Sequence, residues 1–329
     1  MPEESGEEAE GPKEEEEAGA QTQLVEFVVE PNYAGWRLDF YLRQKLARLS
    51  RTRIQALIRK QFPPSLKPST PVKPGMRLQL RRLLPKEPSV PGPNALLVLF
   101  EDEDLLVLDK PAGLPVHPSA RYFHNTLVAQ LAGRFPKPLA PAHRLDRETS
   151  GLLVCSKTPE ASRGLMRAFA ASQVHKEYLA IVEGHPPWAC CTVEAPIAEG
   201  GKAIRIAVRI CPEGKAAATQ VEVLERFERR GAFFCLLKCR PLTGRQHQIR
   251  VHLKHAGFPI VGDKIYGPDE MFFDRFSRHC LEAEAWQRLR LPRHALHASF
   301  LGFCHPRSQK PMQFEAPLPG DLKAFLRGE

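Results

Sequence analysis

The proline-rich stretch from Pro85 to Pro93 constrains the fold of this chain more than any other feature. Four prolines fall within its nine residues, at positions 85, 88, 91 and 93. Proline fixes φ and lacks a backbone N–H, so neither a helix nor a central strand continues through such a run. We therefore predict a linker over residues 84–93, which separates a small module at residues 23–83 from a larger domain at residues 94–329.

The first twenty residues differ in charge from the rest of the chain. They hold nine glutamates, one lysine and no aromatic residue, a net charge of −8, whereas the whole chain carries +9 and the remainder therefore +17. Such an acidic segment buries too little apolar surface to offset the entropy of ordering, so we predict a disordered tail over residues 1–22. The basic remainder favours nucleic acid as partner, then an anionic membrane surface, with a charge excess that serves only solubility as the alternative.

Composition limits the class of protein further. The 329 residues are 43% hydrophobic, which is enough for the core of one large or two ordinary domains. No apolar run approaches the roughly 18 residues of a membrane-spanning helix, and glutamates stand where a signal peptide carries positive charge, so we expect a cytoplasmic protein. The eight cysteines form no Cys-x-x-Cys pair. Reduced, mostly buried thiols therefore fit better than disulfides.

The module at residues 23–83 has the leucine spacing of helices. Leucines recur every four residues from Leu38 to Leu46, and Ser50 has the place of an N-cap for a second helix with apolar positions at Ile54, Leu57 and Ile58. The polar positions are mostly cationic: Arg43, Lys45, Arg48, Arg51, Arg53, Arg59 and Lys60. A phosphate-binding face with Arg51 and Arg53 as RNA contacts is one interpretation, and a solvated basic surface is the other.

The larger domain has more strand-like runs than helix-like runs. The apolar runs 96–100 and 105–109 predict two strands joined by an acidic turn. Further strands are predicted at 151–156, 178–182, 219–227 and 233–239, and helices at 162–171 and 246–256. This order predicts an α+β domain on a mixed or antiparallel sheet.

The polar segment His143–Gly151 precedes a predicted strand, and functional side chains often gather on such loops. Asp146 lies between Arg144 and Arg147, whose charges are expected to depress the pKa of its carboxyl group. A carboxylate of this kind can act as a nucleophile or a base. The alternative is a loop aspartate held by surface ion pairs.

A second polar cluster runs from Thr243 to Leu253. Thr243 and Gln246 have the spacing of a capping box, and the apolar stripe of the helix that follows excludes Arg245 and Arg250. Either arginine is a candidate partner for a phosphate or a catalytic carboxylate, or belongs to a basic surface. The i, i+4 spacing of a zinc site is missing from the histidines of this region, His247, His252 and His255, so we expect no metal.

Lys176 and Tyr178 share one face of a third segment, because side chains alternate along a strand. Tyr178 offers a ring for stacking on a base and a hydroxyl for proton transfer, with a core tyrosine as the alternative.

Together these segments resemble the RluA family of RNA pseudouridine synthases. His143–Gly151 reads His-Arg-Leu-Asp-x-x-Thr-Ser-Gly and is similar to the family's signature. Four further blocks follow the order of the family's motifs: Lys110–Gly113, Lys176–Ala180, Thr243–Asp263 and a C-terminal segment at 296–319.

The N-terminal module is similar to an S4 RNA-binding domain, on the evidence of Arg37-Leu38-Asp39 and Ser50-Arg51-Thr52-Arg53. It departs from the S4 pattern at residues 61–68, where prolines replace the glycine-containing hairpin turn and remove ladder donors.

The resemblance implies conversion of uridine in RNA to pseudouridine without cofactor or metal. The N-glycosidic bond breaks, the uracil turns while held, and its carbon 5 bonds to the ribose. By position, Asp146 is the catalytic aspartate, which attacks either the uracil ring or the ribose C1′. Tyr178 is the active-site tyrosine and Arg250 the basic partner of the aspartate, while Arg144 occupies the space left by the everted nucleotide.

The remaining candidates for contacts with RNA are Lys110, Arg245 and His247, and Arg245 is the second choice as partner of the aspartate. The implied substrate is structured RNA, ribosomal RNA first and transfer RNA second, bound by a monomer. Two other functions compete: a non-catalytic RNA-binding protein, and a metal-dependent hydrolase on the histidine cluster. The joint presence of the aspartate, tyrosine and arginine argues against the former, and the histidine spacing against the latter.

Overall fold

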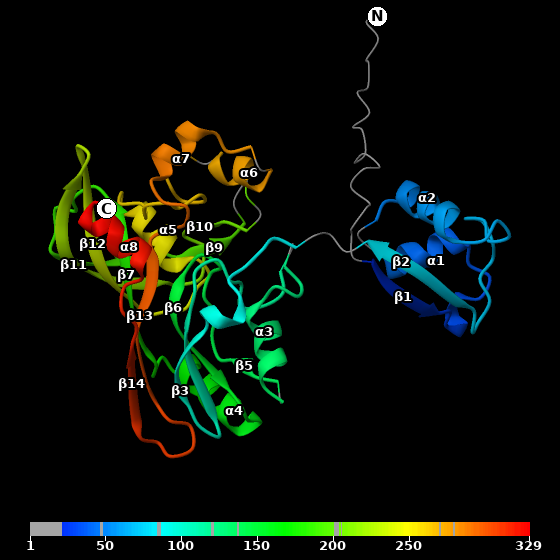
Figure 1. Ribbon diagram of the computed structural model, residues 1–329, viewed down its shortest axis with the longest axis horizontal. Helices are drawn as coiled ribbons and strands as arrows, with labels where there is room; N and C mark the ends of the chain where they lie inside the picture. The colour runs from blue at the N-terminus through cyan, green and yellow to red at the C-terminus, as the bar shows by residue number, and fades with distance from the viewer. Residues whose placement is uncertain are drawn as a thin grey trace, which may run out of the picture. The chain divides into compact units, whose positions relative to one another are not determined.

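The computed structural model describes residues 22–46, 49–83, 87–119, 122–136, 138–200, 204, 206–269, 271–278 and 280–329. The chain divides into two compact units, Met1–Lys86 and Glu87–Glu329, termed here the N-terminal unit and the C-terminal unit (Figure 1). The tail predicted over residues 1–22 lies outside the described residues, except for Thr22, which begins the first strand.

Two helices and a two-stranded antiparallel sheet share one core in the N-terminal unit. Its elements are β1 (Thr22–Val28), η2 (Pro31–Tyr33), α1 (Leu38–Lys45), α2 (Arg51–Gln61) and β2 (Arg77–Leu83). Ser50 caps α2 as predicted, because its Oγ accepts the backbone N–H of Arg53 at 3.3 Å. Ile54 and Ile58 are fully buried, whereas Leu57 is only partly buried. The helix spacing of the sequence is therefore confirmed.

A ten-stranded mixed sheet organises the C-terminal unit and confirms the predicted α+β fold. Eight strands follow the order β3-β4-β6-β13-β7-β12-β11-β8, with β5 paired to β6 and β14 paired to β13. Strand β13 runs parallel to β6 and antiparallel to β7. The strands of the sheet are β3 (Leu97–Glu101), β4 (Leu105–Lys110), β5 (Ala140–Pro141), β6 (Ser150–Ser156), β7 (His175–Glu183), β8 (Cys190–Glu194), β11 (Ala218–Arg229), β12 (Ala232–Pro241), β13 (Leu296–Cys304) and β14 (Pro311–Glu315). A separate hairpin consists of β9 (Ile197–Glu199) and β10 (Val208–Ile210).

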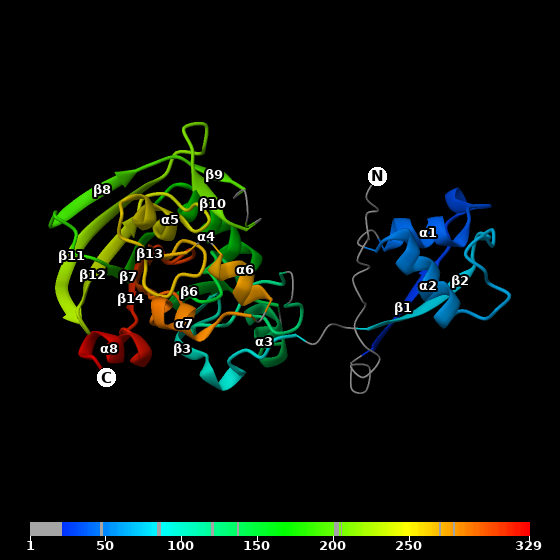
Figure 2. The ribbon, with the colours of Figure 1, turned by 90° about the horizontal axis from the view of Figure 1, so that it is seen from above.

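Helices cover the sheet on both faces. Leu127 and Leu131 of α3 pack with alternate residues of β4 and β6, and Ala161 and Leu165 of α4 pack with the intervening residues. Burial on both faces explains why β4 and β6 read as continuous apolar runs. Helix α5 lies within the curve of β8, β11 and β12 (Figure 2). The helices of this unit are η3 (Pro93–Ala95), α3 (Leu127–Arg134), α4 (Pro159–Ala170), α5 (Gln248–His255), α6 (Phe272–Ser277), α7 (Ala283–Leu289) and α8 (Gly320–Arg327).

Part of the predicted linker belongs to the C-terminal unit. The Glu87 carboxylate accepts the backbone N–H groups of His124 and Asn125, and the Gln130 amide donates to the Pro91 carbonyl. Residues 87–91 are therefore fastened to the domain, because side-chain hydrogen bonds replace the ladder contacts that proline cannot make. No helix in the described part of the chain is long and apolar enough to cross a membrane.

The cysteines are free, but fewer of them are buried than predicted. Four are buried, Cys155, Cys211, Cys235 and Cys239, whereas Cys190, Cys280 and Cys304 are exposed. Strand ends and surface loops expose thiols that composition alone assigns to the core.

Candidate active site

Asp146 meets Arg250 across 104 residues of sequence. Asp146 precedes β6, and Arg250 projects from the first turns of α5. Arg250 Nη1 donates to Asp146 Oδ2 at 2.8 Å, and the Arg250 side chain is 5% exposed and the Asp146 side chain 20%. Asp146 Oδ1 accepts no hydrogen bond from any described residue, and His247 Nε2 lies 3.7 Å from it. One carboxylate oxygen is thus held, while the other is open.

A second carboxylate fixes Arg250 from behind. Asp263 accepts Arg250 Nε at 2.7 Å and Nη2 at 2.8 Å, and its side chain is fully buried. The backbone N–H groups of Ile265 and Tyr266 also donate to Asp263 Oδ1. This bidentate pair leaves Nη1 as the donor for Asp146, so Asp263 fixes the orientation of the Arg250 guanidinium.

The electrostatics keep Asp146 ionised. Burial raises the pKa of its carboxyl group, but the Arg250 charge and hydrogen bond outweigh burial and hold that pKa at about 2. The neighbours in sequence supply little of this effect: Arg147 pairs with Glu148 at 2.8 Å, and Arg144 is exposed on the cleft wall. The prediction of a depressed pKa was right in direction, but the dominant cation comes from α5, because the flanking side chains point elsewhere.

Buried hydrogen bonds anchor the loop that carries Asp146. Thr149 Oγ1 lies 2.7 Å from His294 Nε2, and Ser150 Oγ lies 3.0 Å from His297 Nδ1. Gly151 has φ +111°, and a Cβ there would lie 2.2 Å from the Ala298 carbonyl oxygen. The Thr-Ser-Gly part of the motif therefore fastens the loop to the segment that leads into β13 and to β13 itself, and this fixes the position of Asp146.

Glu148, next in the loop, forms a buried ion pair. Its oxygens accept Lys264 Nζ at 3.0 and 3.1 Å, and the Lys264 side chain is only 3% exposed. Lys264 follows Asp263 directly, so the segment that orients Arg250 also holds the aspartate loop.

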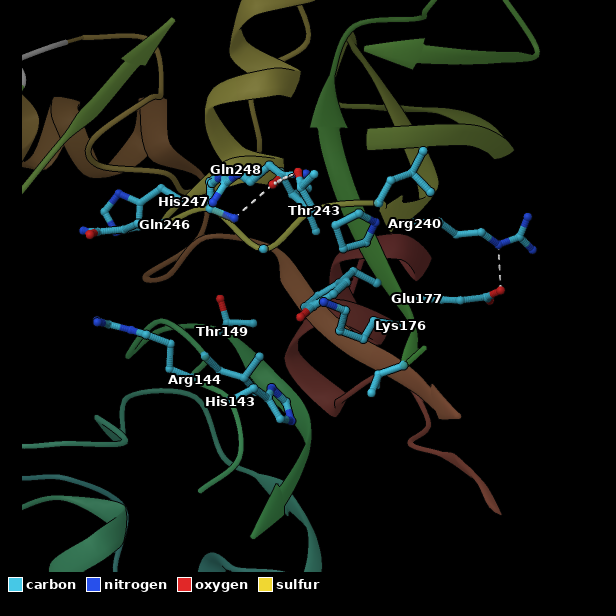
Figure 3. Close-up of a pocket in the computed structure, with 18 of the residues that line it drawn as sticks. His143, Arg144, Thr149, Lys176, Glu177, Arg240, Thr243, Gln246, His247 and Gln248 are labelled. Carbon is cyan, nitrogen blue, oxygen red and sulfur yellow. Dashed lines mark hydrogen bonds and ion pairs between the residues drawn. The ribbon is translucent and has the colours of Figure 1, made fainter. Parts of the chain in front are cut away.

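Asp146 faces a cleft of about 1030 Å³. Its walls come from the aspartate loop, the C-terminal end of α4, the start of β7 and the segment between β12 and α5. In Figure 3, His143, Arg144 and Thr149 lie on one side and Gln246, His247 and Gln248 on the other. A volume of this size admits a nucleotide turned out of its stack.

Tyr178 lines the same cleft, as predicted, with Lys176 two residues before it on β7. Burial and the charge of Asp146 raise the pKa of Tyr178 well above its usual value of 10, so the phenol is neutral at pH 7. Its hydroxyl forms no hydrogen bond with the described parts of the chain. A neutral ring beside the carboxylate can stack on a base and donate one hydrogen bond.

His247 lies deeper in the cleft wall, with its side chain 8% exposed. Its Nδ1 lies 2.9 Å from the Tyr266 hydroxyl, which also accepts the backbone N–H of Val208 at 2.8 Å. Tyr266 in turn places its ring 5.1 Å from the Arg250 guanidinium carbon. One tyrosine thus contacts both side chains that approach Asp146.

The structure separates Arg245 from Arg250. Arg245 is exposed on the cleft rim, and its Nε donates to the Ala216 carbonyl at 3.1 Å. It therefore does not pair with Asp146. The predicted capping box is also wrong, because α5 begins at Gln248 and Thr243 Oγ1 donates to Gln248 Oε1 at 2.7 Å.

Lys110 does not have the RNA contact expected of it. Its side chain is fully buried, and Nζ donates to the carbonyls of Pro111, Leu114 and Arg147. Burial lowers the pKa of Lys110 to about 7. These three hydrogen bonds join the turn after β4 to the loop that carries Asp146, so Lys110 helps to hold that loop in place.

The two RNA candidates of the N-terminal unit lie at the start of α2. Arg53 is exposed, and Arg51 is half exposed, with Nε 3.5 Å from Asp39. Both remain accessible to a phosphate. Both ring nitrogens of buried His252 are hydrogen-bonded, to Thr219 Oγ1 and the Ala195 carbonyl. The described residues contain no group of three or more His, Cys, Asp or Glu side chains that could hold a metal ion.

Asp263, Tyr266 and His294 were not among the predicted site residues. Asp263 is the last residue of the Thr243–Asp263 block, and the sequence assigns it no role. Tyr266 and His294 have no local signal, because their partners lie 19 and 145 residues away in the sequence. Only the fold brings them to the cleft.

Comparisons with known proteins agree with this geometry. The profile of a family described as RNA pseudouridylate synthase matches residues 104–255. An uncharacterized RNA pseudouridine synthase of Chloroflexus aurantiacus is 38% identical over 320 residues, covering 91% of this chain and 92% of the relative. The ribosomal large subunit pseudouridine synthase D of Zymomonas mobilis is 34% identical over 311 residues, covering 89% and 93%. Among solved structures, human RNA pseudouridylate synthase domain containing 1 is 28% identical, with a TM-score of 0.57 and coverage of 70% and 86%.

Proposed function

The chain belongs to the RNA pseudouridine synthase family, and from that premise we propose that Asp146 is the nucleophile that isomerises a uridine of ribosomal RNA. One observation carries the proposal: Asp146 is an anion with one oxygen held by Arg250 and the other open to a cleft of nucleotide size. A nucleophile needs an accessible lone pair and a fixed direction of approach, and this arrangement supplies both.

The reaction is an internal exchange of bonds. The bond between uracil N1 and ribose C1′ breaks, the freed uracil turns, carbon 5 bonds to C1′, and the hydrogen on carbon 5 leaves while N1 gains one. No electron is gained or lost overall. Asp146 attacks either C1′ or carbon 6 of the ring, and Arg250 keeps it ionised until that attack.

Tyr178 and Arg144 would hold the nucleotide. Because its phenol is neutral, Tyr178 is better suited to stack on the uracil than to act alone as the base that removes the proton from carbon 5. Arg144 is exposed at the cleft wall and can occupy the gap that the everted nucleotide leaves in its helix.

The N-terminal unit would capture the RNA. Residues 22–83 hold thirteen lysines and arginines against three acidic residues, a net charge of +10, whereas residues 87–329 carry only +6. Phosphate attraction is therefore concentrated in the smaller unit, as expected of an S4-like module. Ribosomal RNA is the proposed substrate because relatives such as the Zymomonas mobilis protein are named for the ribosomal large subunit.

The test is conversion of large-subunit ribosomal RNA by the purified full-length chain, with pseudouridines mapped before and after incubation. We expect at least one uridine to be converted by the wild-type protein and none by Asp146→Asn. Conversion by the variant would remove Asp146 from the mechanism. RNA binding without conversion by the wild type would instead favour the non-catalytic alternative.

A further inference from the structure

A row of polar groups leads to the open oxygen of Asp146 and has no part in the mechanism above. The backbone N–H of Val208 donates to the Tyr266 hydroxyl at 2.8 Å, and that hydroxyl lies 2.9 Å from His247 Nδ1. On the other side of the imidazole, Nε2 lies 3.7 Å from Asp146 Oδ1. The row begins on β10 and ends in the cleft.

Both side chains in the row are neutral at pH 7. Burial lowers the pKa of His247 to about 4, and burial raises the pKa of Tyr266. A neutral imidazole carries one hydrogen, on either Nδ1 or Nε2.

Two contacts select Nε2. Among the described residues, His247 Nδ1 is the only acceptor within hydrogen-bond distance of the Tyr266 hydroxyl, whose oxygen also accepts the Val208 N–H, so a bare Nδ1 gives the hydroxyl hydrogen its partner. The opposite arrangement would turn the Nε2 lone pair toward the anionic Asp146 oxygen, which is repulsive. Hydrogen bonding at one nitrogen and electrostatics at the other thus favour the same tautomer.

The backbone of His247 also indicates a set orientation. Its φ is 52° and ψ is 17°, a left-handed conformation that is uncommon outside glycine, and its side chain forms no capping hydrogen bond to α5. The imidazole does not cap the helix, so capping does not account for the unfavourable backbone conformation of His247. That conformation instead directs the ring into the cleft.

His247 Nε2 has no hydrogen-bond partner among the described residues, although it lies beside Asp146. A separation of 3.7 Å between Nε2 and Oδ1 is too long for a hydrogen bond, and both atoms border the cleft. We propose that His247 donates a hydrogen bond from Nε2 to an oxygen of the everted uridine, and that Tyr266 is the positioning residue that keeps the hydrogen on Nε2. The proposal rests on the proposed function and adds a substrate contact to those of Asp146, Tyr178 and Arg144.

The chemistry gives such a donor a use during turnover. When the glycosidic bond breaks, negative charge spreads onto the carbonyl oxygens of the departing uracil. A fixed neutral donor stabilises that charge without neutralising Asp146, as a cationic histidine would. The loss of this donor should therefore lower kcat more than it raises KM.

The tautomer can be read in the wild-type protein. Nitrogen-15 labelling of histidine in the full-length chain, with His247 assigned by its disappearance in His247→Asn, distinguishes a protonated from a bare ring nitrogen. We expect a protonated Nε2 and a bare Nδ1 at pH 7, and a mixture of tautomers in Tyr266→Phe. A protonated Nδ1 in the wild type overturns the proposal whatever the variants do.

Kinetics test the contact itself. His247→Gln carries an amide near the position of Nε2, whereas His247→Asn carries one near Nδ1 and tolerates the left-handed backbone. We expect kcat to fall about 100-fold in His247→Asn and to stay within about tenfold of wild type in His247→Gln. Tyr266→Phe keeps the ring on Arg250 and should lose about tenfold in kcat.

Tyr41→Phe is the matched control, because it removes a buried tyrosine hydroxyl from the N-terminal unit, and its kcat should not change. An active His247→Asn beside an inactive Asp146→Asn would overturn this inference and leave the proposed function standing. An active Asp146→Asn would overturn the proposed function instead.

Discussion

Each unit of this molecule builds an aspartate with a pKa of about 2, yet the two aspartates are built for different tasks. In the N-terminal unit, Asp39 receives Arg37 on both oxygens at 3.0 Å and Gln55 at 2.9 Å, with Arg51 at 3.5 Å. Its side chain is fully buried. In the C-terminal unit, Asp146 receives Arg250 on one oxygen only and is 20% exposed. A depressed pKa is therefore common to both and identifies neither as catalytic.

The arginines that pair with the two aspartates also differ in how exposed they are. Arg37 and Arg51 keep side-chain exposures of 43% and 49%, so the buried Asp39 arranges cations that remain open to a ligand. Arg250 is 5% exposed and donates its hydrogen bonds to Asp263 and Asp146. In one unit the carboxylate orients arginines toward the surface, and in the other the arginine orients a carboxylate toward a cleft. An open carboxylate oxygen inside a cleft is the feature that points to chemistry.

The largest effect should separate the two aspartates by activity. Asp146→Asn removes the proposed nucleophile, so turnover should fall about 10⁴-fold or more. RNA affinity should stay within about tenfold, or about 1.4 kcal/mol, because most phosphate contacts lie elsewhere. The variant should remain folded, since Arg250 keeps its bidentate bond to Asp263. Pseudouridine formation and filter binding on the same RNA measure both quantities, and a parallel loss of affinity would contradict the separation of binding from chemistry.

Arg250 is the next test, and here activity and stability should fall together. Arg250→Met leaves Asp146 and Asp263 without their shared cation, and an unpaired buried carboxylate costs about 3–5 kcal/mol. We expect a lower urea midpoint and no turnover.

A double variant isolates the charge effect. Arg250→Met combined with Asp263→Asn removes the buried charge of Asp263 and should recover part of the lost stability, while turnover stays absent because Asp146 has lost its partner. Recovery of turnover in the double variant would show that Arg250 serves the fold and not Asp146.

Asp39→Asn should act on stability rather than on chemistry. The pKa of Asp39 lies below its usual 3.8, so its ionised form stabilises the folded unit above about pH 4, and that contribution is lost as pH falls through 2. A difference of nearly two pKa units corresponds to about 2 kcal/mol. Urea titrations of resolved amide signals from residues 22–83 should show that loss at pH 6 and a smaller one near pH 3. Turnover of a short stem-loop RNA should hardly change, and a pH-independent difference would argue against an ionic role.

Short segments of sequence could predict much of this molecule, because their signals are local. The Ser50 cap, the strand runs around residues 105–109 and 151–156, and the polar loop at Asp146 depend on neighbours within a few residues. They correspond to α2, β4 and β6. The pairing of Asp146 with Arg250 could be predicted only from the resemblance, because the position of an arginine along a helix does not show which residue its side chain contacts.

The burial of charged side chains could not be predicted from neighbouring residues in the sequence. Lys110 and Arg250 are both cations near a motif, but one is enclosed by three carbonyls and the other by two carboxylates. Composition assigns such side chains to the surface, because a lone buried charge is unfavourable. Their partners come from distant segments, and only the assembled sheet shows that the burial is compensated.

The smallest expected effect concerns Arg245, which the polar pattern of the helix alone did not distinguish from Arg250. Arg245 is exposed on the cleft rim with one bond to the Ala216 carbonyl, so it can touch a phosphate but not Asp146. Arg245→Ala should lower RNA affinity by less than about tenfold and reduce the salt slope by about one, with kcat at saturating RNA unchanged. Salt titrations of binding beside single-turnover rates measure both, with Arg163→Ala, an exposed arginine on α4 outside the cleft, as control. A lower single-turnover rate with an unchanged salt slope would return Arg245 to the catalytic group and weaken the contrast between rim and interior.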